Sequence, residues 1–253
     1  EEDYITQNRI IEEAVADGTD VIVFSAIDYE GNAEAIGRAA KEGVKIVVID
    51  SDVKSKEVSC RIGTDNYEAG CLAGKAALDM DEEEINIGIV NFDATTENGQ
   101  SREKGFRDTV GKDKRAVIVD TINVNSTIDS AKEEAEKLLE RIPEINVLVT
   151  FNEWTSLGVG YAVKEAGLAD SVRVVAFDSN VVSVDMLETG EVDALIVQNP
   201  YAMGYLGVEN AYRLLGGHDL DEREVNTSTH LVTKENMYSE ESQRMLFSFD
   251  EIR

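Results

Sequence analysis

Each apolar, β-branched run in this chain ends on a polar residue that can hydrogen-bond a small molecule. These residues carry carboxylate, amide or hydroxyl groups, and neither His nor Lys occurs among them: Ser25, Asp50, Asn91, Asp120, Asn152, Asp178 and Gln198. In open α/β sheets, ligands bind beyond the carboxyl ends of the strands. Such side chains suit a neutral, hydroxyl-rich solute. A second interpretation stays open at each position, because Asp, Ser and Asn also cap the helix that follows a strand.

The acidic composition narrows the class of partner. The 253 residues include 51 acidic and 24 basic side chains, which gives a formal net charge of −27. A field of this sign repels nucleic acid and anionic membranes and disfavours phosphorylated ligands. No apolar run approaches the ~20 residues that a membrane-spanning helix needs. The charge therefore favours a small, uncharged ligand over a nucleic acid.

The sequence contains none of the common catalytic motifs. A GxxxxGK[ST] phosphate loop and a GxSxG nucleophile elbow are both absent, and His218 and His230 lie in contexts typical of surface positions. Acid–base chemistry by converging carboxylates stays open for Asp50, Asp52 and Asp178. No further feature of the sequence supports an enzyme. We therefore expect a binding protein without catalytic residues or cofactor, not an enzyme.

The two cysteines, Cys60 and Cys71, lie in the segment CRIGTDNYEAGC. Their spacing is not that of a CxxC motif and no histidine lies nearby, so they do not predict a metal site. A disulfide between them stays open.

Helix-period segments alternate with the strand-like runs from end to end. The clearest helix is predicted over 130–142, where one face is formed by Ala131, Ala135, Leu138, Leu139 and Ile142. Strands return at intervals of roughly 20–30 residues, the spacing of βαβ units in a parallel sheet. The pattern predicts a doubly wound α/β fold, and the length allows one large domain or two lobes.

Seven segments follow one another in an order that is similar to a known family. They are VVIDSDV, RIGTDNYEAGCLAG, GQSREKGF, VTFNEW, VVAFDSN, IVQNPYAMGYLGV and LVTKEN. Over essentially the whole chain, this order resembles the type I periplasmic binding proteins for sugars, the ribose- and galactose-binding receptors of ABC transporters. The same fold forms the effector-binding core of LacI-type repressors, so the fold alone does not fix the function.

The resemblance implies a set of sugar-binding residues. They are Asp50, Asp52, Arg102, Asn152, Trp154, Asp178 and Gln198. Carboxylates accept hydroxyl protons, while Arg, Asn and Gln side chains donate, so together they can satisfy a buried sugar. For Trp154, stacking on an apolar sugar face and packing against the protein both stay open. Ser51 stands where ribose binders often carry arginine, which argues against ribose itself. Ser126 stands where the family has a stacking aromatic residue, which indicates a different or larger ligand.

The resemblance also implies two doubly wound parallel-sheet lobes joined by a three-stranded hinge. We expect the N-terminal lobe to comprise 1–63 and 199–227, and the C-terminal lobe 64–198 and 228–253. By this mapping the N-terminal lobe lacks the family's first strand, helix and strand.

The function implied is an extracytoplasmic solute-binding protein. It would capture a monosaccharide or related polyol between its lobes, close by hinge motion and deliver the ligand to an ABC transporter permease. The expected protein is a monomer in the periplasm or outside the cell, with a lipid-anchored form included. Two alternatives stay open: the effector-binding core of a LacI-type repressor and the ligand-binding sensor domain of a membrane receptor.

Overall fold

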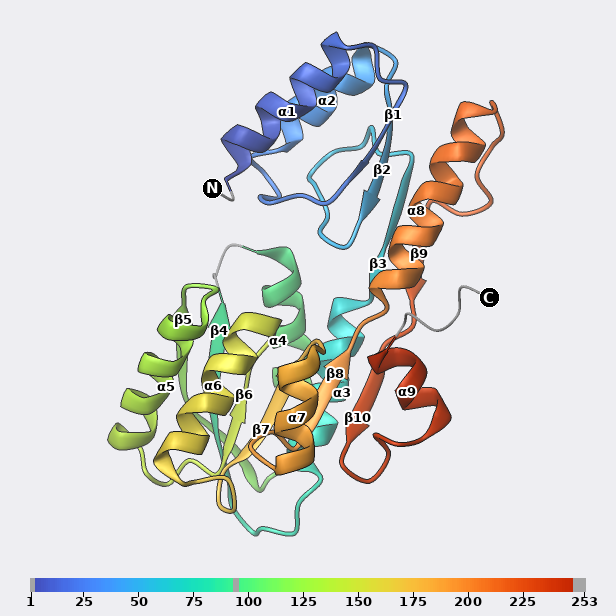
Figure 1. Cartoon of the computed structure of the whole chain (residues 1–253). Coiled ribbons are helices and arrows are strands. Elements are labelled where there is room, and N and C mark those ends of the chain that lie inside the picture. Colours follow the sequence, from blue (N-terminus) through green and yellow to red (C-terminus); the bar gives the residue numbers. More distant parts are fainter. Residues whose placement is uncertain (1–2, 93–95, 248–253) are drawn as a thin grey trace. The chain divides into compact units, whose positions relative to one another are not determined.

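The chain forms two compact units in a computed structural model that describes residues 3–92 and 96–247 (Figure 1). Unit 1 comprises Glu1–Asp65 and Asn199–Ser228, and unit 2 comprises Asn66–Gln198 and Thr229–Arg253. The chain passes from one unit to the other after residues 65, 198 and 228, where the sequence-based boundaries lie at 63, 198 and 227. Each unit is described separately.

Unit 1 is built on a four-stranded parallel sheet. Its strands, in spatial order, are β1 (Val21–Phe24), β2 (Lys45–Ile49), β3 (Cys60–Thr64) and β9 (Glu224–Thr227). Its helices are α1 (Tyr4–Ala16), α2 (Ala33–Lys41) and α8 (Pro200–Leu215). On one face α1 and α2 bury Ile11 and Ile36 against Ile46 and Val48 of β2. On the other face Met203 of α8 joins a smaller core.

Unit 2 is built on a six-stranded sheet. In spatial order the strands are β10 (His230–Thr233), β8 (Ala194–Val197), β7 (Arg173–Phe177), β6 (Val147–Val149), β4 (Ile85–Phe92) and β5 (Ala116–Val124). Only β10 is antiparallel to its neighbour. The central strands are apolar on both faces, as strands covered by helices on both sides must be.

Helices cover both faces of the unit 2 sheet (Figure 1). One face carries α3 (Asn66–Leu78) and α4 (Glu97–Val110), and the other carries α5 (Ile128–Arg141), α6 (Glu153–Ala166) and α7 (Val181–Thr189). The short helix α9 (Glu240–Leu246) lies beside β10. The expected helix over 130–142 is α5, and its predicted apolar face is buried or packed against the core. The predicted fold class of doubly wound parallel sheets is confirmed.

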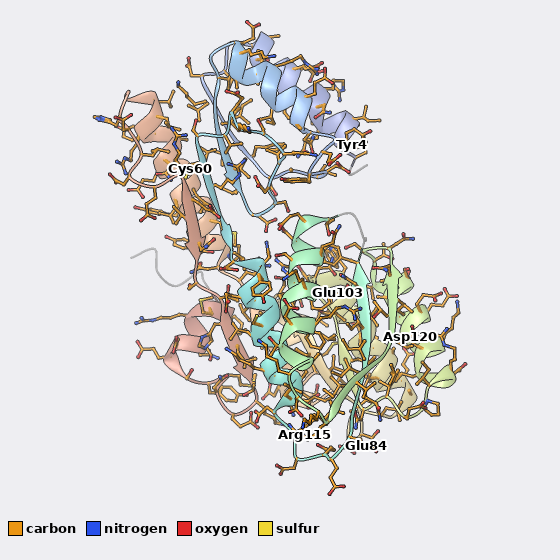
Figure 2. All side chains as sticks on the ribbon, turned by 180° about the vertical axis from the view of Figure 1, so that it is seen from behind. Tyr4, Cys60, Glu84, Glu103, Arg115 and Asp120 are labelled. Atoms are coloured by element: carbon orange, nitrogen blue, oxygen red, sulfur yellow. The ribbon has the colours of Figure 1, made fainter. Side chains whose placement is uncertain are left out.

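Asp120 does not end a strand, contrary to the expectation from the sequence. Strand β5 continues to Val124, so Asp120 lies within it (Figure 2). Arg141 pairs with the Asp120 carboxylate. Strand β5 is the edge of the sheet. An edge strand is partly solvated and tolerates a charged side chain along its length, so a polar residue there does not mark its end.

Candidate functional site

The parallel strands of unit 2 place several of the predicted residues at one edge of the sheet. Asp178 follows β7 directly and Gln198 follows β8, and these two strands are hydrogen-bonded neighbours. Asn152 comes three residues after β6, the next strand across. Arg102 comes from α4, the helix after β4. The sheet order therefore brings together residues that lie up to 96 positions apart in the chain.

Arg102 is the most deeply buried of the predicted residues, with 3% of its surface exposed. Its Nε donates to Asn66 Oδ1 at 2.8 Å, its Nη1 to the Phe151 carbonyl oxygen at 2.7 Å and its Nη2 to Gln198 Oε1 at 2.8 Å. The guanidinium carbon lies 4.9 Å from the centre of the Phe177 ring. Hydrogen bonds from all three nitrogens, together with the Phe177 ring against one face, fix the plane of the forked guanidinium group.

Gln198 connects the arginine to the aspartate. Its Oε1 accepts from Arg102, and its Nε2 donates to Asp178 Oδ1 at 2.5 Å. The amide is thus oriented by both neighbours. We call Asn66, Arg102, Gln198 and Asp178 the Arg102 cluster; it alternates donors and acceptors along one chain of contacts.

Asp50 and Asp178 share an unusual backbone conformation. They are the only non-glycine residues with positive φ in the described part of the chain, at 58° and 67°. Each follows a central strand, and each backbone N–H still donates to the neighbouring strand, to Ile62 O and Ile196 O, both at 2.9 Å. The left-handed region is costly for residues with a Cβ and such outliers are concentrated at functional sites. Each unit therefore has an aspartate in the left-handed backbone conformation directly after a central strand.

Asp50 is surrounded by hydroxyl groups in unit 1. Ser51 Oγ donates to Asp50 Oδ2 at 3.2 Å, and Ser25 Oγ lies 3.5 Å from the same oxygen. Ser25 follows β1 and Asp50 follows β2, and because these strands are hydrogen-bonded neighbours their ends meet. The carboxylate is placed to accept hydroxyl protons.

Asp52, by contrast, contributes to the local structure of its loop. Its Oδ1 accepts from Arg61 Nε at 2.6 Å and from the backbone N–H of Val53 at 2.7 Å. Arg61 also donates to the Ser55 carbonyl at 2.6 Å. These contacts engage one carboxylate oxygen of Asp52 in holding the segment after β2.

Asn152 acts as a helix cap, the second interpretation that the sequence left open. Its Oδ1 accepts from the backbone N–H of Thr155 at 3.1 Å, at the start of α6, and its Nδ2 donates to Ser126 Oγ at 2.6 Å. Trp154, in the first turn of the same helix, is 49% exposed. The indole is therefore half exposed and not part of a packed core.

Asn91 is a strand-end residue that lies inside the unit. It is buried, and its Nδ2 donates to Glu103 Oε2 at 2.5 Å. Glu103 in turn forms an ion pair with Arg107 at 2.7 Å. Asn91 therefore belongs to a network between β4 and α4 and not to the Arg102 cluster.

Asn66 is the residue of the cluster that sequence reasoning missed. It is the first residue of α3, and its side chain accepts from Arg102, which lies 36 positions further along the chain. Its position in GTDNYEAG favours a helix start, for which Asn is common. Its partner follows only from the packing of α3 on α4.

The cysteines do not add a site. Cys60 and Cys71 are buried free thiols, and burial raises the pKa of Cys60 above its ordinary value. Within residues 3–92 and 96–247 no group of His, Cys, Asp and Glu could hold a metal ion. No helix in these same ranges is long and apolar enough to cross a membrane.

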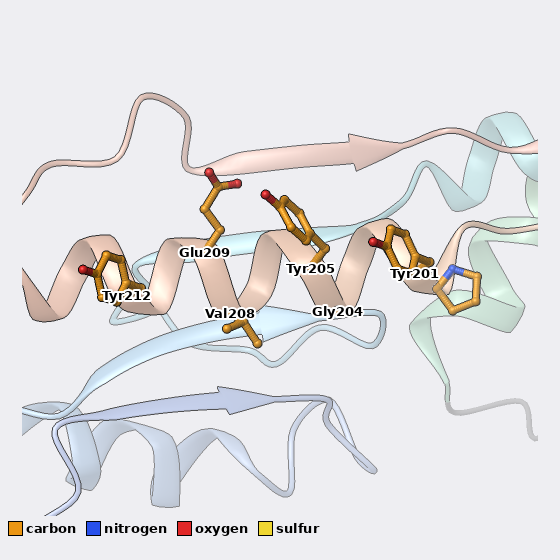
Figure 3. A pocket seen from close by; sticks show the side chains of 7 residues that line it. Tyr201, Gly204, Tyr205, Val208, Glu209 and Tyr212 are labelled. Carbon is orange, nitrogen blue, oxygen red and sulfur yellow. The ribbon is translucent and has the colours of Figure 1, made fainter. Parts of the chain in front are cut away.

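A pocket of about 680 Å³ lies along α8 and contains none of the predicted residues (Figure 3). It is lined by Pro200, Tyr201, Gly204, Tyr205, Val208, Glu209 and Tyr212. The rings of Tyr201 and Tyr205 stack with their centres 6.3 Å apart. Its lining lacks the alternating donors and acceptors of the Arg102 cluster, so it does not share the chemistry of the strand-end residues.

The comparisons with known proteins agree on one family. A family model described as "Periplasmic binding protein domain" matches residues 1–219. The D-ribose/D-allose-binding protein of Pseudomonas aeruginosa is 27% identical over 242 residues, which span 92% of this chain and 76% of that protein.

Two solved structures are similar over nearly the whole chain. A carbohydrate transporter solute-binding protein from Agrobacterium radiobacter, in complex with D-arabinose, matches with a TM-score of 0.91 and 29% identity, covering 97% of this chain and 84% of that one. An ABC transporter solute-binding protein from Agrobacterium vitis, with bound D-fucose, matches with a TM-score of 0.91 and 27% identity, covering 96% and 85%.

Proposed function

The chain belongs to the periplasmic binding protein family, and on that premise we propose that it captures a monosaccharide or a related polyol for an ABC importer. The similar proteins are named for sugars: D-ribose and D-allose in one case, and D-arabinose and D-fucose in the solved complexes. Because the family and these relatives are binding proteins, the expectation that the chain is not an enzyme is confirmed.

The Arg102 cluster is the observation that carries the proposal. A sugar hydroxyl both donates and accepts a hydrogen bond, so it is best held between a carboxylate and a cationic or amide donor. Asp178 supplies the acceptor and Arg102 the donor, and Gln198 keeps them in register through contacts of 2.5 and 2.8 Å. Charged groups make the stronger hydrogen bonds, which compensates for the loss of water around a polar ligand.

The remaining predicted residues extend this chemistry. Asp50 offers a second carboxylate beside two serine hydroxyls. Trp154 offers an exposed aromatic ring, which suits the apolar face of a pyranose or furanose. In this proposal the protein works as a monomer outside the cytoplasm, in the periplasm or at the cell surface, and presents its sugar to an ABC permease.

A thermal-shift screen tests the proposed function. The panel contains D-ribose, D-allose, D-arabinose, D-fucose and simple polyols. We expect one of them to raise the melting temperature with increasing dose, because a ligand at about 100 times its Kd stabilises the native state by about 2.7 kcal/mol. Calorimetry then gives the affinity of that sugar.

Two conservative variants connect the binding to the Arg102 cluster. Asp178→Asn and Arg102→Lys retain most of the side-chain volume but weaken a charge-assisted or forked hydrogen bond, so we expect each to lower affinity at least tenfold. Asp185→Asn, on α7 outside the cluster, serves as the control and keeps the wild-type affinity. Wild-type affinity in both cluster variants would contradict the site, and no binding of any panel member would contradict the function.

A further inference from the structure

Asn66 lies where the chain enters unit 2, and its side chain meets the buried arginine of the cluster. We propose that Asn66 is a positioning residue for the sugar site, which sets the orientation of the Arg102 fork without contacting the sugar. The proposal rests on the proposed function, because Arg102 is the donor that the sugar would use.

The Asn66 amide is fixed on both sides. Its Oδ1 accepts from Arg102 Nε at 2.8 Å, and its Nδ2 donates to Asn98 Oδ1 at 3.1 Å. The bond to Asn98 orients the amide so that its oxygen faces the guanidinium. Arg102 Nη1 and Nη2 donate to the Phe151 carbonyl oxygen and to Gln198 Oε1, while Asn66 accepts on the Nε side of the fork. Loss of the Asn66 acceptor therefore removes a restraint on the orientation of the guanidinium.

Two glycines bring Asn66 and Arg102 within reach of one another. Gly70 lies one turn after Asn66 on α3, and a Cβ there would lie 1.9 Å from the Arg102 carbonyl oxygen. Gly105 lies one turn after Arg102 on α4, and a Cβ there would lie 2.0 Å from the Tyr67 carbonyl oxygen. Helix backbones approach this closely only where side chains are absent. The contact is therefore built into the helix pair.

Asn66 lies at the point where the chain crosses from unit 1 to unit 2. It is the first residue of unit 2 after the chain leaves unit 1, and Gln198 is the last residue before the chain leaves unit 2. The side-chain amide oxygens of both residues accept hydrogen bonds from the same guanidinium. Through Gln198 the connection continues to Asp178. The residues at these two chain crossings, Asn66 and Gln198, therefore both bind the buried guanidinium of Arg102.

A ligand-free measurement tests the positioning directly. In the wild-type protein, we expect the Nε–H proton of Arg102 to exchange slowly with solvent and to give a resolved NMR signal. Asn66→Ala removes the acceptor and should shift this signal and speed its exchange at least tenfold, whereas Asn66→Asp keeps an acceptor and should preserve slow exchange. An unchanged Arg102 signal in Asn66→Ala overturns the proposal whether or not any sugar binds.

A binding measurement tests the consequence for function. Each variant is titrated by calorimetry with the panel sugar that stabilises the wild-type protein most. We expect Asn66→Ala to bind at least tenfold more weakly and Asn66→Asp to bind within about threefold of wild type, because a charged acceptor replaces a neutral one.

The matched control is Asn236→Ala. Asn236 also uses both ends of its amide within unit 2, accepting from the Thr233 N–H at 2.9 Å and donating to the Leu231 carbonyl at 3.0 Å. It should lose stability but keep affinity. Equal losses of affinity in Asn66→Ala and Asn236→Ala would reduce the effect to general destabilisation and overturn the proposal. A wild-type protein that binds no panel sugar would contradict the proposed function, while the Arg102 signal would still decide the role of Asn66.

Discussion

At the scale of single residues, the left-handed conformation of Asp50 and Asp178 has a measurable energetic signature. At an ordinary helical position a protein with Ala is more stable than the same protein with Gly, because Gly loses more backbone freedom on folding. At positive φ the order reverses, because Ala pays the steric cost of its Cβ. We expect Asp178→Gly to be more stable than Asp178→Ala by about 1 kcal/mol in urea unfolding.

The control for this comparison is Asp185, which lies inside helix α7. There, Asp185→Ala should be more stable than Asp185→Gly by about 1 kcal/mol. The Asp50 pair should follow the order of the Asp178 pair, since φ is positive at both. The ordinary helical order at Asp178 would show that its backbone relaxes out of the left-handed region in solution.

The sequence predicts where these residues lie better than what they touch. Apolar runs locate Asp50, Asp178 and Gln198 at strand ends, because the local pattern of apolar residues indicates where a strand begins and ends. The bonds from Arg102 to Asn66 and Gln198 span 36 and 96 positions and depend on helix packing and sheet order, for which no local pattern exists. The contact of Asp52 with Arg61 spans only nine positions, but it depends on the pairing of β2 with β3.

At the scale of elements, the close approach of α3 and α4 gives a second prediction. A Cβ at Gly70 or Gly105 would overlap backbone oxygen atoms that cannot move independently of their helices. We expect Gly70→Ala and Gly105→Ala each to destabilise the protein by about 2 kcal/mol or more, as overpacked contacts do. Gly37→Ala on α2 is the control, because a Cβ there meets nothing within 4 Å.

Unfolding in urea separates the two cases. Gly37→Ala should be neutral or stabilising by up to about 1 kcal/mol, since Ala is the better helix former. If Gly70→Ala matched Gly37→Ala, the two helices would have to lie further apart than the structure places them. The Gly70 variant should also weaken sugar binding, because Asn66 and Arg102 are separated along with their helices.

The prediction of helices and strands was correct where the apolar periodicity was strong. It was wrong for the end of a solvent-exposed edge strand. Helix α5 shows its apolar face in the sequence and forms as expected. Strand β5 extends past Asp120, because an edge strand does not need an unbroken apolar run. Asn152 illustrates a different limit: capping a helix and lying at a strand end are the same position in a βα unit, so sequence alone could not separate the two roles.

At the scale of the whole molecule, the net charge of −27 predicts a response to salt. Like charges repel one another across the folded surface and destabilise the compact state. Exposed ion pairs such as Arg9–Glu13 act in the opposite direction but contribute only about 0–1 kcal/mol each. We expect the excess of acidic residues to dominate, so that salt stabilises the protein.

Melting curves at low and high ionic strength test this balance. The melting temperature should rise between about 0.01 M and about 1 M sodium chloride, as the screening length falls from about 30 Å to about 3 Å. Potassium chloride serves as the control, since a general screening effect does not depend on the cation. A melting temperature that falls with salt would show that the ion pairs outweigh the repulsion.

Trp154 provides the protein with a single intrinsic fluorescence probe. It is the only tryptophan in the chain, so indole emission excited apart from tyrosine comes from one side chain. That side chain is 49% exposed and stands in the first turn of α6, two residues after Asn152. A sugar that covers the ring removes water from it and shifts the emission to the blue. We expect the emission of Trp154 to follow occupancy of the proposed site in dilute solution without any label. An emission wavelength that stays unchanged at a saturating sugar concentration would place Trp154 outside the site.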